Sequence, residues 1–143
     1  MNITNYRSAI AATLYALSCT VASAEVLVIV SPKNTIGKLS ADQAADLFLG
    51  SESAFPGGVQ ATPIDQTEGS PLRDEFYTKA TGKTPAQVKA YRSKMMFTGK
   101  GRPPKEADNA AAVKKLVADN PNAIGYIDKG SADSSVKVIL TLP

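Results

Sequence analysis

"TPIDQTEGSPLRDEF", residues 62–76, contains the features that decide the fold. Its first part continues an apolar segment that predicts a strand, and Pro63 indicates an edge strand or the end of a strand. "TEGS" then predicts a turn. Ser70 is a preferred N-cap, Pro71 suits the first helical position and acidic residues follow, so a helix is expected to begin here. A strand that passes through a short turn into a helix is typical of an α/β domain.

The rest of the chain continues this alternation of strands and helices. We expect strands at residues 25–31, 59–65, 123–127 and 136–142, and helices at residues 40–50, 70–82, 84–96 and 109–120. The intervening "FTGKGRPPKE", residues 97–106, is expected to be irregular. The order β-α-β-α-α-α-β-β predicts one α/β domain, residues 25–143, with helices packed on a mixed sheet.

Several apolar positions are expected to be buried. The Val-rich strand at residues 25–31 is expected to be buried on both faces. Phe97 and Tyr126 are expected in or at the edge of the core, and Gly125 at a close backbone approach. The remaining expected core residues lie on two helices: Val88, Tyr91, Met95 and Met96 on one, and Ala112, Leu116 and Val117 on the other. A partner groove is the alternative for Met95 and Met96.

Residues 1–24 differ from the remainder of the chain. Arg7 is their one charged side chain, and an apolar run follows that is short for a membrane span. Ala22-Ser23-Ala24 is the small-x-small pattern of a signal-peptidase site, which predicts a secretory signal peptide cleaved after Ala24 and a periplasmic mature chain. A retained N-terminal anchor and lipidation at Cys19 are the alternatives.

Composition excludes several kinds of chemistry. The 143 residues are 43% hydrophobic and 20% charged, as in a soluble globular protein. The chain has no His, and the predicted cleavage removes its one Cys, so zinc sites, thiol nucleophiles and Ser-His catalysis are not expected. We predict no metal and no cofactor. The mature chain has 15 Lys and Arg against 13 Asp and Glu, without a long basic block, so nucleic-acid binding is not expected either.

Taken together, the motifs resemble one lobe of the periplasmic phosphate-binding proteins of ABC transporters. "LSADQAADLFLG", "TPIDQTEGSPLRDEF", "TGKG" and "NAIGYI" occur in the order and spacing of that family. The resemblance extends from Val26 to about Asp128. It implies a three-layer α/β lobe of the type II periplasmic-binding-protein fold, with the other lobe missing. The chain also resembles a group of short, secreted, single-lobe relatives of this family.

The resemblance places a phosphate corner at the turn after residues 59–65. Glu68, Gly69 and Ser70 match the family's Asp, Gly and Ser, whereas Gln66 stands where the family has Arg, and Pro71 and Leu72 where it has Gly and Thr. These departures remove a bidentate cation, a hydroxyl and an amide donor. The residues therefore allow either a small-anion site or a plain helix cap. The ligand-binding candidates are Gln66, Glu68, Gly69, Ser70, Leu72 and Arg73, with Arg73 able to fold back as the cation.

A second candidate loop is "TGKG", Thr98, Gly99, Lys100 and Gly101. Its glycines would let amides approach an anion, and Lys100 would add charge. The spacing is not that of a P-loop, and a solvated basic loop is the alternative.

These observations favour two functions. The first is a secreted, periplasmic, phosphate-binding-protein-like domain that binds a small anion weakly or with a partner, because one lobe offers one wall of a cleft. The second is a periplasmic interaction module that has lost ligand binding and contacts a periplasmic or membrane protein. Ser70 has no evident base, so we do not expect an enzyme. The oligomeric state is not indicated.

Overall fold

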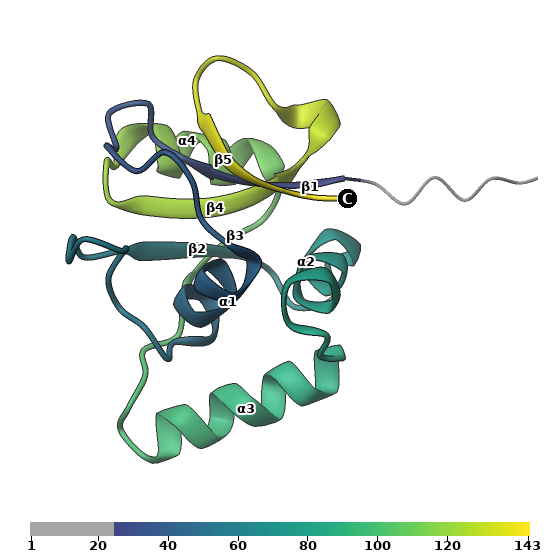
Figure 1. Cartoon of the computed structure of the whole chain (residues 1–143). Coiled ribbons are helices and arrows are strands. Elements are labelled where there is room, and N and C mark those ends of the chain that lie inside the picture. Colours follow the sequence, from purple (N-terminus) through teal and green to yellow (C-terminus); the bar gives the residue numbers. More distant parts are fainter. Residues whose placement is uncertain (1–24) are drawn as a thin grey trace, which may run out of the picture.

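A five-stranded mixed sheet organises residues 25–143, which are the residues that the computed structural model describes (Figure 1). Its strands are β1 (Val26–Val30), β2 (Thr62–Gln66), β3 (Lys105–Ala107), β4 (Ala123–Asp128) and β5 (Lys137–Leu142). Their order across the sheet is β3-β2-β4-β1-β5. β2 runs parallel to both neighbours, whereas β1 runs antiparallel to β4 and β5. The predicted mixed sheet is confirmed; the predicted signal peptide, residues 1–24, lies outside the described residues.

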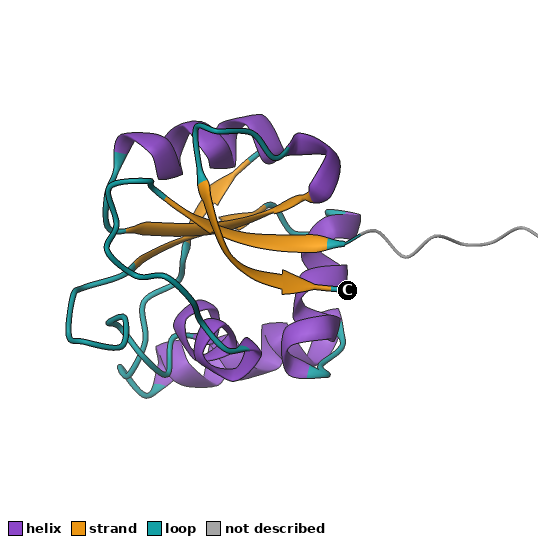
Figure 2. Cartoon of the chain, turned by 45° about the horizontal axis from the view of Figure 1, so that its top comes forward, coloured by secondary structure: helices purple, strands orange, loops and turns teal. Residues whose placement is uncertain are grey.

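Helices cover both faces of the sheet, which gives the three predicted layers (Figure 2). They are α1 (Ala41–Leu49), α2 (Pro71–Thr81), α3 (Pro85–Phe97) and α4 (Ala110–Asp119), with a 3-10 turn at Lys129–Ser131. α4 packs on one face and α1 and α2 pack on the other. α3 lies on the outer side of α1 and α2 (Figure 1). Among residues 25–143, no helix is both long and apolar enough to cross a membrane.

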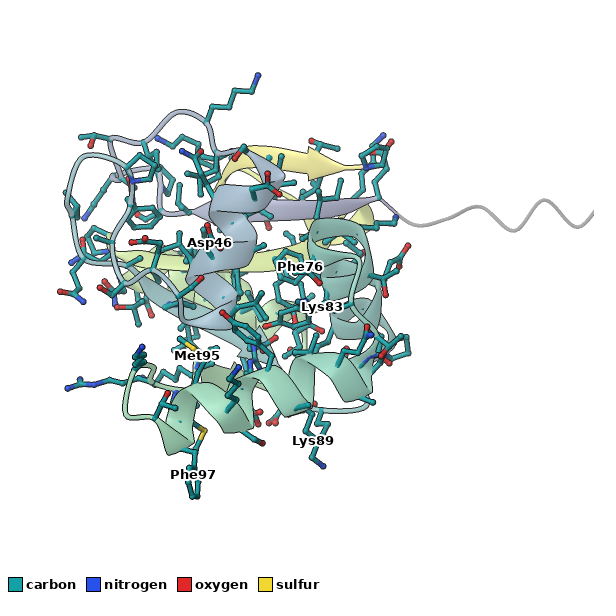
Figure 3. The ribbon with its side chains drawn as sticks, turned by 60° about the horizontal axis from the view of Figure 1, so that its bottom comes forward. Asp46, Phe76, Lys83, Lys89, Met95 and Phe97 are labelled. Atoms are coloured by element: carbon teal, nitrogen blue, oxygen red, sulfur yellow. The ribbon has the colours of Figure 1, made fainter. Side chains whose placement is uncertain are left out.

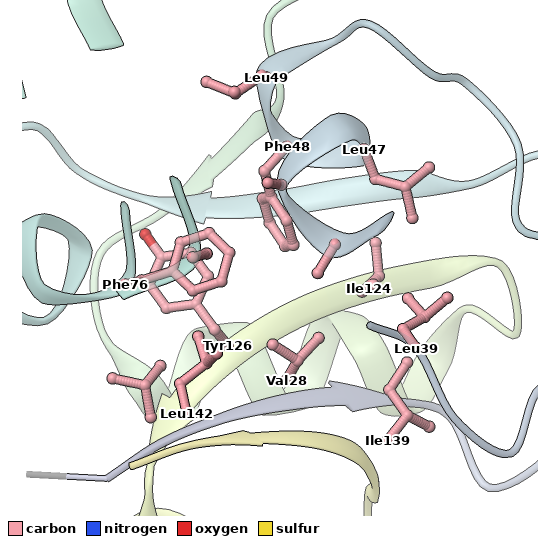
Figure 4. Close-up of a cluster of buried hydrophobic side chains, with 14 of the residues drawn as sticks. Val28, Leu39, Leu47, Phe48, Leu49, Phe76, Ile124, Tyr126, Ile139 and Leu142 are labelled. Carbon is pink, nitrogen blue, oxygen red and sulfur yellow. The ribbon is translucent and has the colours of Figure 1, made fainter. Parts of the chain in front are cut away.

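Two apolar cores lie on opposite faces of the sheet. Between the sheet and α1 and α2, the rings of Phe48, Phe76 and Tyr126 pack together, with Phe76 stacked on Tyr126 at 4.1 Å between centroids (Figure 4). On the other face, α4 buries Val113 and Val117 against β1, β2 and β4. All five residues of β1 are buried, as predicted, because this strand has a neighbour on each side and a core on each face.

The predicted helix starts are confirmed by their capping bonds. The Ser40 and Thr84 side chains each accept a hydrogen bond from the amide three residues later, and Gln43 and Gln87 complete capping boxes at α1 and α3. Asn109 accepts from Ala112 at the start of α4. Local side-chain chemistry therefore determines where these helices begin.

Several details differ from the sequence prediction. The stretch expected to be irregular contains β3, which pairs in parallel with β2. Of the two alternatives for Pro63, the strand end is confirmed and the edge strand is not, because Pro63 lies at the start of β2, where pairing with β3 has not yet begun. Phe97 was predicted at the core but is 96% exposed, and Met96 is 54% exposed, because the end of α3 extends past α1 and α2. In α4, Val113 and Val117 are buried, while Ala112 and Leu116 are only partly buried.

Candidate functional site

The turn between β2 and α2 holds the residues predicted to bind a ligand. It joins the carboxyl end of a parallel strand to the start of a helix, which is where open α/β sheets bind ligands. The Ser70 amide donates to the Thr67 carbonyl at 3.1 Å, and Gly69 has a φ of 90°. This is a type II turn, whose third position requires the positive φ that glycine adopts without strain. The predicted Gly-Ser corner is therefore a real turn.

Ser70 has the geometry of a helix cap. Its hydroxyl oxygen accepts from the Arg73 amide at 3.4 Å, and its hydroxyl proton is donated to Gln66 Oε1 at 3.0 Å. Gln66 is buried and donates in turn from Nε2 to the Tyr126 carbonyl at 3.2 Å. The sequence allowed either a small-anion site or a helix cap, and the complete cap is present. The Ser70 hydroxyl donates its one proton to a group of the protein itself.

Asp65 is a fully buried carboxylate directly before this turn. Its Oδ2 accepts from the Tyr77 hydroxyl at 2.8 Å and from Arg92 Nη2 at 2.6 Å. Its Oδ1 accepts from the Gln66 amide at 2.9 Å and from the Tyr126 hydroxyl. A buried carboxylate is stable only when it is paired and hydrogen-bonded, and Asp65 satisfies both conditions.

The two tyrosines of this network are held in their neutral form. Burial, and then the negative charge of Asp65, raise the pKa values of Tyr77 and Tyr126 well above the usual value for tyrosine. Both hydroxyls donate to the same carboxylate, so ionising either would place a second negative charge beside it. The tyrosines therefore act as fixed donors.

Arg73 lies at the turn, and its charge is already compensated. Its Nη1 donates to the Gln66 carbonyl at 3.0 Å and lies 3.5 Å from Glu106 Oε1, while its Nε is 3.8 Å from Asp65 Oδ2. The two arginines, Arg73 and Arg92, are thus balanced by two carboxylates, Asp65 and Glu106. An anion at this corner would meet no surplus of positive side-chain charge from these four residues.

Backbone amides around the turn keep unused hydrogen-bonding capacity. Within residues 25–143, the amides of Glu68, Gly69 and Leu72 donate no hydrogen bond. The buried Nε of Arg92 also has no partner there. Amides at the amino end of a helix are donors that a small anion can accept from.

A hollow of about 360 Å³ lies beside the turn, between it and the start of α3. Its charged lining residues are Glu68, Asp74, Arg73 and Lys89, two of each sign. Lys89 Nζ is 3.3 Å from Glu68 Oε1 in an exposed ion pair. The hollow is therefore lined by charged side chains of both signs, without a net charge from these four residues.

Three residues of the second candidate loop, Gly99, Lys100 and Gly101, line a different and larger hollow of about 870 Å³, whereas Thr98 does not. The Gly99 amide donates to the Met96 carbonyl at 3.1 Å and the Lys100 amide to the Met95 carbonyl at 3.0 Å. With Gly99 at a φ of 70°, this is the Schellman motif that ends α3. The Thr98 amide also donates to the Lys94 carbonyl, at 3.1 Å, so three of the four amides of this loop are used to end the helix. The structure does not bring the two candidate loops to one hollow.

Two members of the charge network, Asp65 and Arg92, were not among the predicted site residues. Asp65 had a visible signal, since it is the one charged residue of β2 and follows the apolar Ile64. Arg92 follows Val88 by four residues, so it falls on the buried face of α3. A charge on the buried face of a helix indicates a partner in the interior.

Comparison with known proteins supports the fold and leaves the family open. No protein-family model matches the sequence, and no curated protein matches it. Among solved structures, an ABC-type phosphate transport receptor from Vibrio cholerae is similar with a TM-score of 0.65 at 22% identity, over 82% of this chain and 47% of that protein. A Clostridium perfringens protein described as a phosphate ABC transporter substrate-binding protein, with bound phosphate, gives 0.64 at 22% identity, over 82% and 45%. PstS from Borrelia burgdorferi gives 0.63 at 17% identity, over 81% and 47%.

The chain therefore has the α/β fold of part of a phosphate ABC transporter substrate-binding protein, which confirms the predicted resemblance and fold class. It spans about half the length of the solved proteins that it matches. At these identities the likeness establishes the fold alone. These similar proteins are described as transport substrate-binding proteins and not as enzymes.

Proposed function

We propose that this chain is a periplasmic substrate-binding-protein-like domain that binds a small oxyanion, with phosphate the first candidate, weakly or together with a partner protein. The observation that carries the proposal is the Gly69 turn. At this turn and in the first turn of α2, the amides of Glu68, Gly69 and Leu72 donate no hydrogen bond within the described residues. The fold in which this turn occurs is similar to that of proteins described as phosphate-binding. The positive end of a helix dipole favours an anion at that position.

Side chains contribute less to this site than the sequence predicted. The Ser70 hydroxyl donates to Gln66, and the charge of Arg73 is offset by Asp65 and Glu106. Glu68 and Asp74 beside the hollow repel an anion. Backbone donors with so little net charge support weak binding, and we expect a dissociation constant of about 1 mM or weaker.

A phosphate titration followed by amide NMR tests the proposal. Saturable shifts of the Glu68, Gly69 and Leu72 amides are expected, with no equivalent change when chloride is added at the same ionic strength. Glu68→Gln should tighten binding, because it removes a carboxylate from the hollow. Shifts that are absent, or that are spread evenly over the chain, would contradict an anion site at this turn.

The chain offers a matched control for the cap. Ser70→Ala and Thr84→Ala each remove an N-cap hydroxyl in front of a proline, and each should cost about 1 kcal/mol of stability. Only Ser70→Ala loosens the turn that carries the free amide donors of Glu68, Gly69 and Leu72. Only this variant should therefore alter the phosphate-induced shifts. If both variants change them equally, the shifts report general loosening of the fold.

A protein-interaction module without a ligand is the second candidate. The observation in its favour is that Gln66, Ser70 and Arg73, three of the predicted ligand-binding residues, already bond to groups of the chain itself. Under this function phosphate produces no saturable shift at any concentration, whereas the turn and its network keep their bonds. In both cases we propose a binding role and not a catalytic one.

A further inference from the structure

The charges of the chain are segregated by segment. Between Lys83 and Lys105 there are seven Lys and Arg side chains and no Asp or Glu. The rest of residues 25–143 holds eight Lys and Arg and all 13 Asp and Glu. One segment thus carries a net charge of +7 and the remainder carries −5, although the sum is close to neutral. The cations are spaced along the sequence, so no basic run is evident in the composition.

Most of this basic segment is α3 with the loop that follows it, the outer layer of the molecule (Figure 1). Lys83 lies just before α3, and Lys105 begins β3. Two of its cations are paired within the chain, Arg92 with Asp65 and Lys89 with Glu68. The other five make no ion pair with a carboxylate among residues 25–143: Lys83, Lys94, Lys100, Arg102 and Lys105. Of these five, Lys94, Lys100 and Arg102 lie in α3 or in the loop that follows it, and all three are exposed.

An exposed aromatic side chain lies among these cations. Phe97, the last residue of α3, is 96% exposed, and Met96 beside it is 54% exposed. Figure 3 shows Phe97 and Lys89 pointing away from the body of the protein. Lys94 precedes Phe97 by three residues and Lys100 follows it by three, and the Schellman motif fixes the chain between them. An exposed aromatic side chain thus lies within three residues, in both directions, of an exposed cation.

We propose that this α3 surface, made of Lys94, Met96, Phe97, Lys100 and Arg102, docks on an anionic lipid bilayer, with Phe97 entering the interfacial region. Unpaired cations supply attraction to acidic headgroups, and an exposed aromatic side chain supplies the apolar contact. The proposal is independent of the Gly69 turn, because none of these five residues belongs to that turn or lines the hollow beside it.

The shape of the surface favours a bilayer over an acidic protein. Apart from Gln87 and Lys89, the exposed side chains between Ala86 and Ser93 of α3 are small: Ala86, Ala90 and Ser93. A stable protein interface needs a broad apolar core, which this convex helix does not present. A bilayer requires no complementary shape, only cations and an apolar side chain at the contact.

Co-sedimentation with lipid vesicles tests the proposal. The chain should bind phosphatidylcholine vesicles that contain about 30% phosphatidylglycerol. It should bind vesicles of pure phosphatidylcholine much more weakly, and binding to the anionic vesicles should decrease as the salt concentration is raised. Lys100→Gln with Arg102→Gln should weaken binding about 25-fold, since each cation near an anionic surface contributes about fivefold. Phe97→Ser should weaken it about tenfold. Variants are compared in the same chain, so any contribution of residues 1–24 is common to all.

Matched controls separate docking from general attraction. Lys33→Gln with Lys115→Gln makes the same change in net charge at exposed positions outside α3, and Val138→Ser removes an exposed apolar side chain from β5. Both controls should bind like the parent chain. Equal weakening by the two double variants, or equal binding to neutral and anionic vesicles, would overturn the proposal. Retention on poly-glutamate that depends on Lys100 and Arg102, without vesicle binding, would overturn it in favour of an acidic protein partner.

Discussion

Asp65 is the residue on which the interior of the β2–α2 corner depends. It is completely buried, and four other side chains and a backbone amide contact its two oxygens. Besides β2 itself, three elements carry side chains that contact Asp65: α2 with Tyr77 and Arg73, α3 with Arg92, and β4 with Tyr126. A single carboxylate thereby ties the outer helix α3 to the sheet.

Asp65→Asn should destabilise the fold by about 3–5 kcal/mol, because it leaves the Arg92 and Arg73 charges without their buried counter-charge. The free energy of unfolding in urea measures the effect. Asp133→Asn is the control, since it breaks a bridge to Lys114 at an exposed site and should change little. In a double-mutant cycle, Asp65→Asn with Arg92→Met should cost less than the sum of the single changes. A loss no larger than that of the control would contradict this role for Asp65.

The same network predicts a loss of stability at alkaline pH. Because the folded-state pKa values of Tyr77 and Tyr126 are raised, their contribution is fully present below the unfolded tyrosine pKa of about 10 and is lost as the pH rises above it. Urea unfolding from pH 8 upward should show a free energy that falls above about pH 10, by up to about 1.4 kcal/mol per pH unit for each tyrosine. Tyr77→Phe should reduce the slope. A free energy of unfolding that stays constant above that pH would contradict raised folded-state pKa values for the two hydroxyls.

At the scale of elements, the features that depend on near neighbours in sequence could be predicted, and those that depend on distant partners could not. Ser40, Ser70 and Thr84 cap their own helices, so the starts of α1, α2 and α3 are local. β3 has three residues, two of them exposed, and exists because β2 offers an unpaired edge. Phe97 is apolar, but its exposure depends on where α3 ends relative to α1 and α2, which residue type does not encode.

Gly125 controls how closely α4 approaches the sheet. A Cβ at this position would lie 2.6 Å from Val113 Cγ1 and 3.1 Å from Val117 Cγ2, so Gly125→Ala forces α4 away from β4. We expect a loss of about 1–3 kcal/mol in the free energy of unfolding. Gly37→Ala is the matched control, because no atom lies within 4 Å of its added Cβ. Equal stability of the two variants would mean that α4 shifts at no cost.

At the scale of the whole molecule, the candidate site combines a predictable part with an unpredictable one. The Gly69 turn could be predicted, since a Gly-Ser pair before a proline is a local signal. The pairing of Arg92 with Asp65 joins residues 27 positions apart through the placement of α3, so the sequence could not show that the charges at the corner are balanced. Lys94, Lys100 and Arg102 likewise lie on the outer layer only because α3 packs outside α1 and α2 (Figure 1).

The proposed periplasmic location depends on residues 1–24 and has its own test. A signal peptidase reads small side chains at the first and third positions before the cut, here Ala24 and Ala22. Mass spectrometry of the exported protein should therefore find Glu25 at the amino terminus, and Ala22→Leu should cause the uncut precursor to accumulate. Ser23→Leu changes the intervening position, which is not read, and should be processed normally. Because both variants add the same bulk to adjacent positions, uncut Ser23→Leu would show that apolar bulk alone blocks processing, and a cut Ala22→Leu chain would place the cleavage elsewhere.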